Sequence, residues 1–168
     1  MVEQRQRRYF LGANWKCNGT TAFAKDIVNH LINDLEYDQN KLGTLKIIIY
    51  KLYRFICMCG EFLFCLLFLT DIMVLPGFLH LALVSAIVKP GIMVAAQNCS
   101  AFAEGAYTGE VAADHIKDYQ VHHVMIGHSE RRRMHGETQE IVAQKVLQAE
   151  DCDLGILYCL GETKEDRD

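Results

Sequence analysis

The sequence of 168 residues predicts an α/β fold built around a parallel sheet. Short apolar runs alternate with segments of helical periodicity, an order that favours parallel strands joined by right-handed crossovers. Polar side chains follow the end of each apolar run, so they gather on one rim, as an α/β barrel requires. No Gly-x-Gly-x-x-Gly follows any predicted strand, which disfavours a doubly wound dinucleotide-binding sheet.

Composition narrows the class of protein further. Hydrophobic residues make up 51% of the chain and charged residues 23%, which favours a globular fold over disorder. The net charge of −4 argues against a nucleic-acid partner. Seven irregularly spaced cysteines indicate free thiols in a reducing cytosol, and Cys57 and Cys59 are too close for a zinc ribbon or a redox pair. Residues 1–8 are polar with no apolar core behind them, so we expect no export signal and a cytoplasmic protein.

The first predicted strand spans residues 9–13 and is closed by Asn-Trp-Lys at 14–16. Residues 18–21 have the composition of a turn and a helix cap. In the segment that follows, apolar residues recur every four positions and predict a helix with one buried face, formed by Phe23, Ile27, Leu31 and Leu35.

An almost wholly apolar stretch then interrupts this pattern. From residue 47 to 69 only Lys51, Arg54 and Glu61 carry charge. The length is close to that of a membrane span, but three charges inside it argue against one. A soluble protein would not expose so large an apolar surface either. Three interpretations of residues 45–70 therefore remain open: a membrane anchor, a folded insertion, or sequence foreign to the fold, such as translated non-coding sequence.

Beyond this stretch the alternation of strands and helices returns. Apolar runs that stop at Pro, Gly or polar residues predict strands at 72–75, 92–96, 121–126 and 154–160. Between them the sequence predicts a well-covered helix at 78–88, a short helix at 112–119, and a helix at 138–149 with Ile141, Val142, Val146 and Ala149 facing inward.

The run at 124–132 is the strongest candidate for a functional site. A buried strand stops at Gly127, and His128, Ser129, Glu130 and two arginines follow at once. Ionisable groups at the carboxyl end of a barrel strand are typical of an active site. The other strands also end in polar residues, namely Asn14, Lys16, Gln97, Asn98 and Glu162.

Five blocks, in order along the chain, closely resemble the triosephosphate isomerase family. They are GANWKCNG at 12–19, VAAQNC at 94–99, GAYTGE at 105–110, IGHSERR at 126–132 and CLGET at 159–163. The resemblance covers residues 8–40 and 71–168, and it omits 45–70, which favours a foreign origin for that stretch. It implies a partial (β/α)8 TIM barrel with about five of eight βα units, forming one incomplete domain over 1–168.

The resemblance also implies a reaction and a set of site residues. The family interconverts dihydroxyacetone phosphate and glyceraldehyde 3-phosphate through an enediol, without metal or cofactor, as a cytoplasmic homodimer. By motif, Asn14 orients the substrate, and Lys16 places a positive charge beside the phosphate and the developing enediolate. His128 donates a hydrogen bond to the substrate oxygens as a neutral imidazole. Ser129 and Glu130 support these residues.

Other motif residues have structural or interface roles by the same resemblance. Gln97, Asn98 and Thr108 belong to the loop that protrudes into the dimer interface in the family. Arg131 and Arg132 are expected to form structural ion pairs. The remaining four histidines of this half of the chain match no catalytic position: His115, His122, His123 and His135.

The glutamate base of the family has no counterpart here. That residue ends strand six, and the sequence stops at Asp168, just past strand five. Glu104, Glu110, Glu130 and Glu162 occupy other motif positions. We therefore expect the chain by itself to be inactive. The alternative is a non-catalytic or membrane-tethered half-barrel that serves as an interaction module, and a longer transcript carrying the glutamate would discriminate the two.

Overall fold

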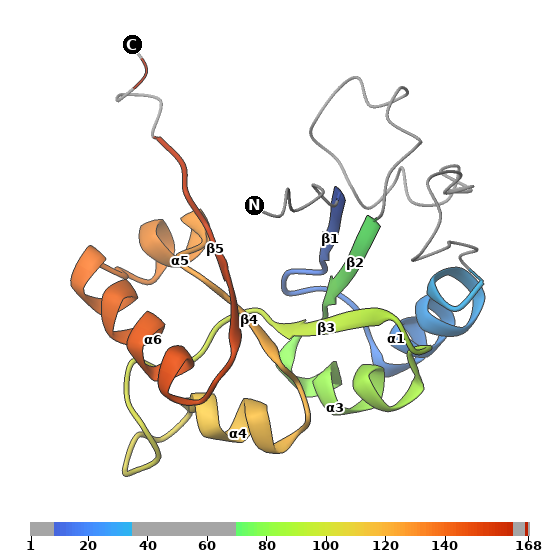
Figure 1. Cartoon of the computed structure of the whole chain (residues 1–168), viewed down its shortest axis with the longest axis horizontal. Helices are drawn as coiled ribbons and strands as arrows, with labels where there is room; N and C mark the ends of the chain where they lie inside the picture. Colours follow the sequence, from blue (N-terminus) through green and yellow to red (C-terminus); the bar gives the residue numbers. More distant parts are fainter. Residues whose placement is uncertain (1–8, 35–69, 163–166, 168) are drawn as a thin grey trace, which may run out of the picture. The chain divides into compact units, whose positions relative to one another are not determined.

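The computed structural model describes residues 9–34, 70–162 and 167 of the chain (Figure 1). It divides into two compact units, residues 1–93 and 94–168, and each is described by itself. The predicted apolar stretch at 45–70 lies outside the described residues, except for Thr70. In the described part of the chain, no helix is long and apolar enough to cross a membrane.

The first unit begins with a parallel pair of strands. β1 (Tyr9–Asn14) pairs with β2 (Thr70–Leu75) over their whole length, and Asn14 lies opposite Leu75 at the carboxyl end. Two helical segments, α1 (Thr21–Ile27) and the π-helical turn η1 (Val28–Ile32), follow β1, and α3 (Phe78–Ile87) follows β2. These strands and helices confirm the predicted order of elements in this half.

The predicted cap of α1 is present, but its predicted buried face is wrong. Thr20 Oγ1 accepts a hydrogen bond from the Phe23 backbone N–H at 3.2 Å. The buried residues are Ala24, Val28 and Ile32, one position beyond the predicted stripe, whose described members are only half-buried. Ala24 is fully buried on a helix that contacts α3, and alanine is too weakly apolar to reveal this in a hydrophobicity pattern.

The helix α3 is less covered than its composition predicts. Leu81 and Val84 are its buried residues, whereas Leu79 is 97% exposed. The end of α3 is tied to the end of η1 through Asn33, whose Nδ2 donates to the Ile87 carbonyl at 3.0 Å. Asn33 Oδ1 also accepts from the Lys89 backbone N–H at 2.8 Å. A single amide side chain therefore satisfies polar groups of the α3 terminus.

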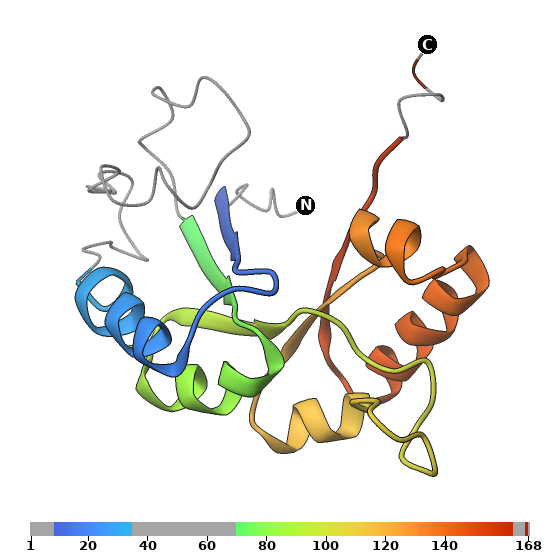
Figure 2. The same ribbon diagram turned by 180° about the vertical axis from the view of Figure 1, so that it is seen from behind.

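The second unit contains three parallel strands and three helices. β4 (His123–Ile126) pairs with both β3 (Ile92–Ala96), whose first two residues belong to the first unit, and β5 (Gly155–Tyr158). Within this unit the strands lie in the order β3-β4-β5. The connecting helices, seen from behind in Figure 2, are α4 (Ala113–Asp118), α5 (Ser129–Met134) and α6 (Gln139–Asp151). The fold is α/β with five parallel strands, as predicted for a partial TIM barrel.

Two features of this unit differ from the sequence prediction. The six-residue helix α5 was not predicted, because it has no buried residue and is too short to show an apolar stripe. In α6, Val142 and Ala149 are buried as predicted, while Ile141 and Val146 are half-buried. The third buried residue of α6 is Lys145, a charged side chain that the pattern did not predict to face inward.

Candidate functional site

In the first unit, the predicted site residues Asn14 and Lys16 lie in a tight turn at the end of β1. Asn14 Oδ1 accepts a hydrogen bond from the Lys16 backbone N–H at 2.8 Å, which closes the turn. Lys16 has φ +54°, a left-handed conformation that is unfavourable for a residue with a Cβ. Its side chain is exposed. Unusual backbone geometry of this kind persists where the surrounding structure determines it, and it occurs often at functional sites.

Trp15 is the residue that anchors this turn. It is 5% exposed, and its ring meets Phe23 edge-on with the ring centroids 6.2 Å apart. Its backbone N–H donates to the Leu75 carbonyl at 3.0 Å, and its carbonyl accepts from Asn18 Nδ2 at 3.1 Å. One backbone hydrogen bond therefore ties the turn to β2, while the Asn18 side chain and the packing of the indole on Phe23 hold the rest of it in place.

In the second unit, His128 lies where β4 passes into α5. Gly127 precedes it with φ +78°, and His128 itself is the N-cap of the helix. His128 Nδ1 accepts a hydrogen bond from the Glu130 backbone N–H at 3.2 Å. The same nitrogen lies 3.6 Å from Glu130 Oε2, which would make an ion pair only with a protonated ring.

The shorter of these two contacts determines the state of the ring. A backbone N–H requires a lone pair on Nδ1, and 3.6 Å is beyond hydrogen-bond range for the carboxylate. With Nδ1 as the acceptor, the ring nitrogen left to act as a donor is Nε2. Its side chain is 21% exposed, so this Nε2–H is a donor on a partly buried ring.

The residues that follow His128 have different surroundings. Ser129 is exposed and Glu130 is half-buried. Their supporting role remains a prediction, although Glu130 contributes its backbone N–H to the imidazole. Arg131 makes the predicted ion pair, with its Nε 2.7 Å from Glu137 Oε1. Arg132 instead donates to neutral acceptors, including the Gly127 carbonyl at 2.9 Å from Nε.

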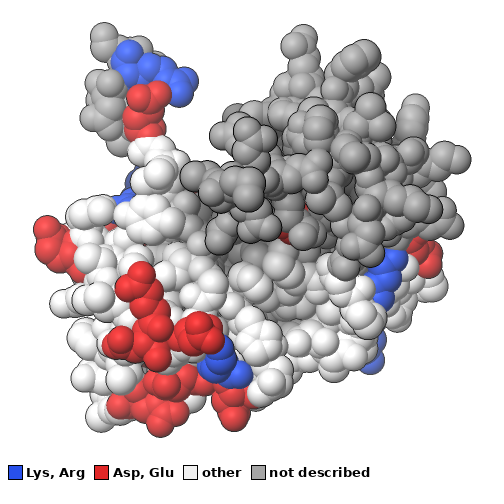
Figure 3. Space-filling view, in the orientation of Figure 1, with Lys and Arg blue, Asp and Glu red and all other residues white. Residues whose placement is uncertain are grey.

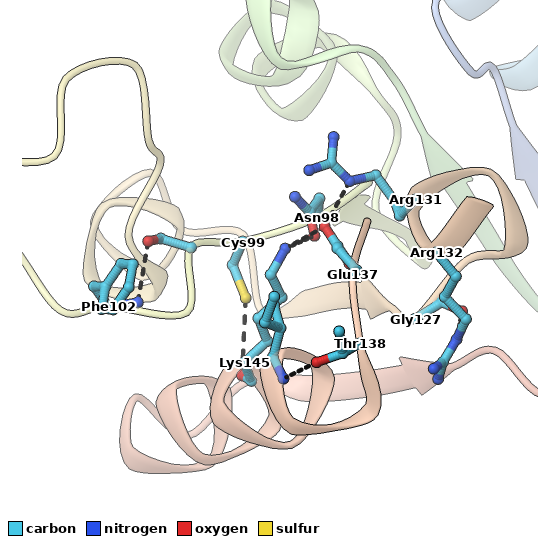
Figure 4. A network of polar contacts seen from close by, with 11 residues as sticks. Asn98, Cys99, Phe102, Gly127, Arg131, Arg132, Glu137, Thr138 and Lys145 are labelled. Atoms are coloured by element: carbon cyan, nitrogen blue, oxygen red, sulfur yellow. Dashed lines mark hydrogen bonds and ion pairs between the residues drawn. The ribbon is translucent and has the colours of Figure 1, made fainter. Parts of the chain in front are cut away.

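A buried polar network, drawn in Figure 4, lies beside this segment. Glu137 and Lys145 are 6% and 3% exposed, and Lys145 Nζ contacts Glu137 Oε1 at 2.5 Å. Lys145 Nζ also donates to Asn98 Oδ1 at 2.9 Å, and the Lys145 carbonyl accepts a weak bond from Cys99 Sγ. Sequence reasoning missed Lys145 because charged residues usually face solvent. The available signal was its spacing from Val142 and Ala149, which places it on their face of α6.

This network sets the protonation of its buried groups. Burial would raise the pKa of Glu137, but hydrogen bonds from Lys145 and Arg131 outweigh it and hold that pKa below its usual value. Among the residues that the structure describes, none donates a hydrogen bond to the buried Glu137 Oε2. Burial also raises the pKa of the Cys99 thiol to about 11, so Cys99 is a protonated core residue at neutral pH.

The buried network makes the free energy of unfolding depend on pH in the acidic range. Because the folded-state pKa of Glu137 is lowered, its carboxylate stabilises the fold above the unfolded pKa, and this contribution is lost as pH falls through the folded pKa. We expect Glu137→Gln to be less stable than wild type at neutral pH, and the difference to shrink below about pH 4. Urea unfolding across this range measures it. Glu150→Gln, at an exposed position of α6, is the control; a difference for Glu137→Gln that stays constant with pH contradicts the assignment.

The loop predicted to protrude into a dimer interface belongs to the second unit. Asn98 directs its Oδ1 to Lys145 within the unit, while Gln97 is half-buried and Thr108 exposed. Phe102 and Tyr107 stack on one another with ring centroids 4.5 Å apart, and both rings are about half exposed. The loop thus presents aromatic surface, and its role in a dimer remains a prediction.

The other histidines have no arrangement typical of catalysis. His115 lies 3.2 Å from Glu104 Oε1 at the surface, and His122 and His135 are exposed. Burial, with a smaller contribution from His122, lowers the pKa of the half-buried His123. Across the described ranges, no three His, Cys, Asp or Glu side chains gather in a way that could hold a metal ion.

Comparison with known proteins gives the family. A sequence model described as Triosephosphate isomerase matches residues 66–168, which include β3 to β5 and His128. The chain belongs to the triosephosphate isomerase family. It is 33% identical over 162 residues to the cytosolic triosephosphate isomerase of Oryza sativa subsp. japonica, an alignment that covers 96% of this chain and 53% of the relative.

Other members of the family show the same extent of similarity. The triosephosphate isomerase of Coxiella burnetii is 33% identical, and the cytosolic enzyme of Stellaria longipes is 34% identical. Each alignment covers 96% of this chain and 52% of the relative. The chain therefore spans about half the length of the curated relatives it matches.

Proposed function

We propose that the chain contributes the substrate-binding and electrophilic residues of a triosephosphate isomerase, with a triose phosphate as its ligand. The observation that carries this proposal is the hydrogen bond from the Glu130 N–H to His128 Nδ1, which leaves the proton on Nε2. A neutral Nε2–H donor polarises a carbonyl without giving up a full proton to it. This matches the role that the motif gives His128.

Asn14 and Lys16 complete the proposal on the same grounds. The turn closed by Asn14 Oδ1 presents the Lys16 side chain at the surface of the first unit. A fixed positive charge stabilises both a phosphate group and the negative charge that develops on the enediolate oxygens. Asn14 orients the substrate with its amide. The assignment of these residues and His128 to one reaction rests on the family motifs.

The reaction also needs a base that moves a proton between the carbonyl carbon and its neighbour. Glu104, Glu110, Glu130 and Glu162 match other positions of the family pattern, and none of them is a candidate. We propose that the 168 residues bind substrate without turning it over. The cytoplasmic location named for the rice relative, the homodimer of the family and the lack of a cofactor are part of this proposal.

Titration of the 168-residue chain with dihydroxyacetone phosphate, followed by NMR, tests the function. We expect saturable changes at both His128 and Lys16. Removing a hydrogen bond to a charged group costs about 1.5–3 kcal/mol, so Lys16→Met should weaken binding about 10- to 150-fold. The neutral bond from His128 contributes about 0.5–1.5 kcal/mol, so His128→Asn should weaken binding about 2- to 10-fold. His135→Asn, at an exposed histidine outside the motifs, should bind as wild type does.

The results that contradict the proposal are specific. An unsaturable titration, or equal loss in the His128→Asn and His135→Asn variants, would remove the binding site from His128. Absence of binding together with capture of a protein partner would favour the interaction module instead. Isomerase turnover by the 168-residue chain would show that one of its own carboxylates serves as the base.

A further inference from the structure

We infer that Arg132 and Tyr158 are positioning residues that hold the His128 imidazole in its donor orientation. This inference rests on the function proposed for His128. Arg132 contacts His128 through the backbone, because its Nε donates at 2.9 Å to the carbonyl of Gly127, the preceding residue. That carbonyl belongs to the peptide plane that joins Gly127 to His128, so the bond fixes the plane from which His128 projects.

Hydrogen bonds constrain the chain on the other side of His128 as well. The His128 carbonyl accepts from the Arg131 N–H at 2.8 Å and from the Arg132 N–H at 3.1 Å. The imidazole itself accepts from the Glu130 N–H. Of these contacts, the others come from backbone N–H groups, and the Arg132 guanidinium contributes the one that comes from a side chain. Removing it would release the peptide plane before His128 while the α5 backbone bonds remain.

Gly127 supplies an independent sign that the guanidinium is built into this turn. Its φ of +78° disfavours any residue with a Cβ. A Cβ at this position would also lie 2.9 Å from Arg132 Nη2 and 3.4 Å from Val142 Cγ1. The guanidinium therefore occupies the space that a side chain at 127 would take. The turn and the arginine fit together only with glycine at that position.

The orientation of the guanidinium is set by two neutral side chains from other elements. Arg132 Nη1 donates to Gln139 Oε1 at 2.9 Å, and Nη2 lies 3.4 Å from the Tyr158 hydroxyl. Gln139 Nε2 donates to the same hydroxyl at 3.1 Å, which links the two acceptors. Tyr158 is paired with Ile126 at the ends of β5 and β4, so the sheet register brings its hydroxyl to this place.

These contacts form a chain from the sheet to the imidazole. Tyr158 and Gln139 orient the guanidinium of Arg132, which in turn holds the Gly127 carbonyl. That carbonyl fixes the peptide plane from which the His128 side chain projects. Gln139 is the first residue of α6 and Tyr158 the last of β5, so three segments of the second unit meet at Arg132. If Arg132 only stabilised the fold, changing Tyr158 would not alter the orientation of the His128 imidazole. If Arg132 positions the ring, changing Tyr158 should alter that orientation.

Nitrogen NMR of the ¹⁵N-histidine-labelled, ligand-free chain tests the inference. We expect wild type to show one protonated and one acceptor nitrogen in His128. In Arg132→Met the two signals should move toward an average, because the ring now exchanges between tautomers. Tyr158→Phe should give a smaller shift in the same direction, and Arg132→Lys a partial rescue, since an ammonium reaches the carbonyl but not both side-chain acceptors. Arg133→Met, at an exposed position of the same helix, should leave the signals unchanged.

Circular dichroism of each variant separates positioning from folding. If Arg132→Met fails to fold, Tyr158→Phe and Arg132→Lys decide the question. Wild-type signals in folded Arg132→Met and Tyr158→Phe variants would overturn the inference. Equal changes in Arg133→Met would do the same. Because no substrate is present, failure of the proposed triose phosphate binding leaves this result unaffected.

Discussion

Replacing Lys145 with methionine is expected to lower the free energy of unfolding by about 3–5 kcal/mol, the usual cost of removing one partner of a buried ion pair. Methionine keeps the apolar stem but removes the ammonium that contacts Glu137 Oε1 and Asn98 Oδ1. The Glu137 carboxylate, 6% exposed, would then depend on Arg131. Its Oε2 already lacks a donor among the described residues, so the remaining charge is poorly compensated. Urea unfolding followed by circular dichroism measures the change.

Lys117→Met is the matched control for this prediction. Lys117 Nζ lies 3.4 Å from Asp153 Oδ2, but the Lys117 side chain is 35% exposed and that of Asp153 is fully exposed. Figure 3 shows acidic side chains gathered toward the lower left of the face in view, with Lys or Arg side chains beside them. The exposures of Lys117 and Asp153 make theirs a solvated pair. A pair of this kind contributes at most about 1 kcal/mol. The double variant Glu137→Leu with Lys145→Met should recover much of the lost stability, since it removes both buried charges and leaves only Arg131, whose side chain is 35% exposed. Equal losses in the two lysine variants would contradict the account of the network.

The second large effect is expected from Trp15→Ala, at about 3–5 kcal/mol for a buried tryptophan. Trp15 is 5% exposed, and its ring packs edge-on against Phe23 of α1. The alanine variant leaves a cavity between the turn after β1 and the helix. We also expect weaker binding of triose phosphate, because the turn that holds Asn14 and Lys16 loses its apolar anchor. Since Trp15 is the single tryptophan, unfolding must be followed by circular dichroism.

Leu79→Ala provides the control for Trp15→Ala. Leu79 is 97% exposed on α3, so its truncation removes little buried surface and should change stability by no more than about 0.5 kcal/mol. Trp15→Phe should fall between the two, because it keeps an aromatic ring but loses volume. A Trp15→Ala variant as stable as Leu79→Ala would show that the turn does not depend on the indole.

The parts of this fold that the sequence predicted are those with strong local signals. The strand ending at Ile126 is a continuous apolar run that stops at Gly127, and α6 was predicted from the periodic apolar residues of 138–149. Thr20 was likewise predicted in a turn and cap segment, and it caps α1. In each case the residue types and their spacing predict the same element, because strand burial and helix capping depend on neighbours in sequence.

The parts that were missed depend on contacts between distant residues. The buried charge of Lys145 is stabilised by Glu137 and Asn98, which lie 8 and 47 positions away in the sequence. A pattern of neighbouring residues cannot reveal such partners. The contact of Arg132 with Tyr158 spans 26 positions and follows from the β4–β5 register. Arg132 was predicted in an ion pair, and its contacts are instead to a carbonyl, an amide and a hydroxyl. The type of a charged residue does not indicate which partner the fold will bring to it.

The proposed role of His128 is to present an Nε2–H donor to a triose phosphate. The most direct measurement follows both His128 ring nitrogens by NMR while dihydroxyacetone phosphate is added to the labelled chain. We expect Nδ1 to remain an acceptor, held by the Glu130 N–H, while the Nε2–H signal shifts and saturates. A proton found on Nδ1, or an Nε2–H signal that does not respond to the ligand, would contradict it.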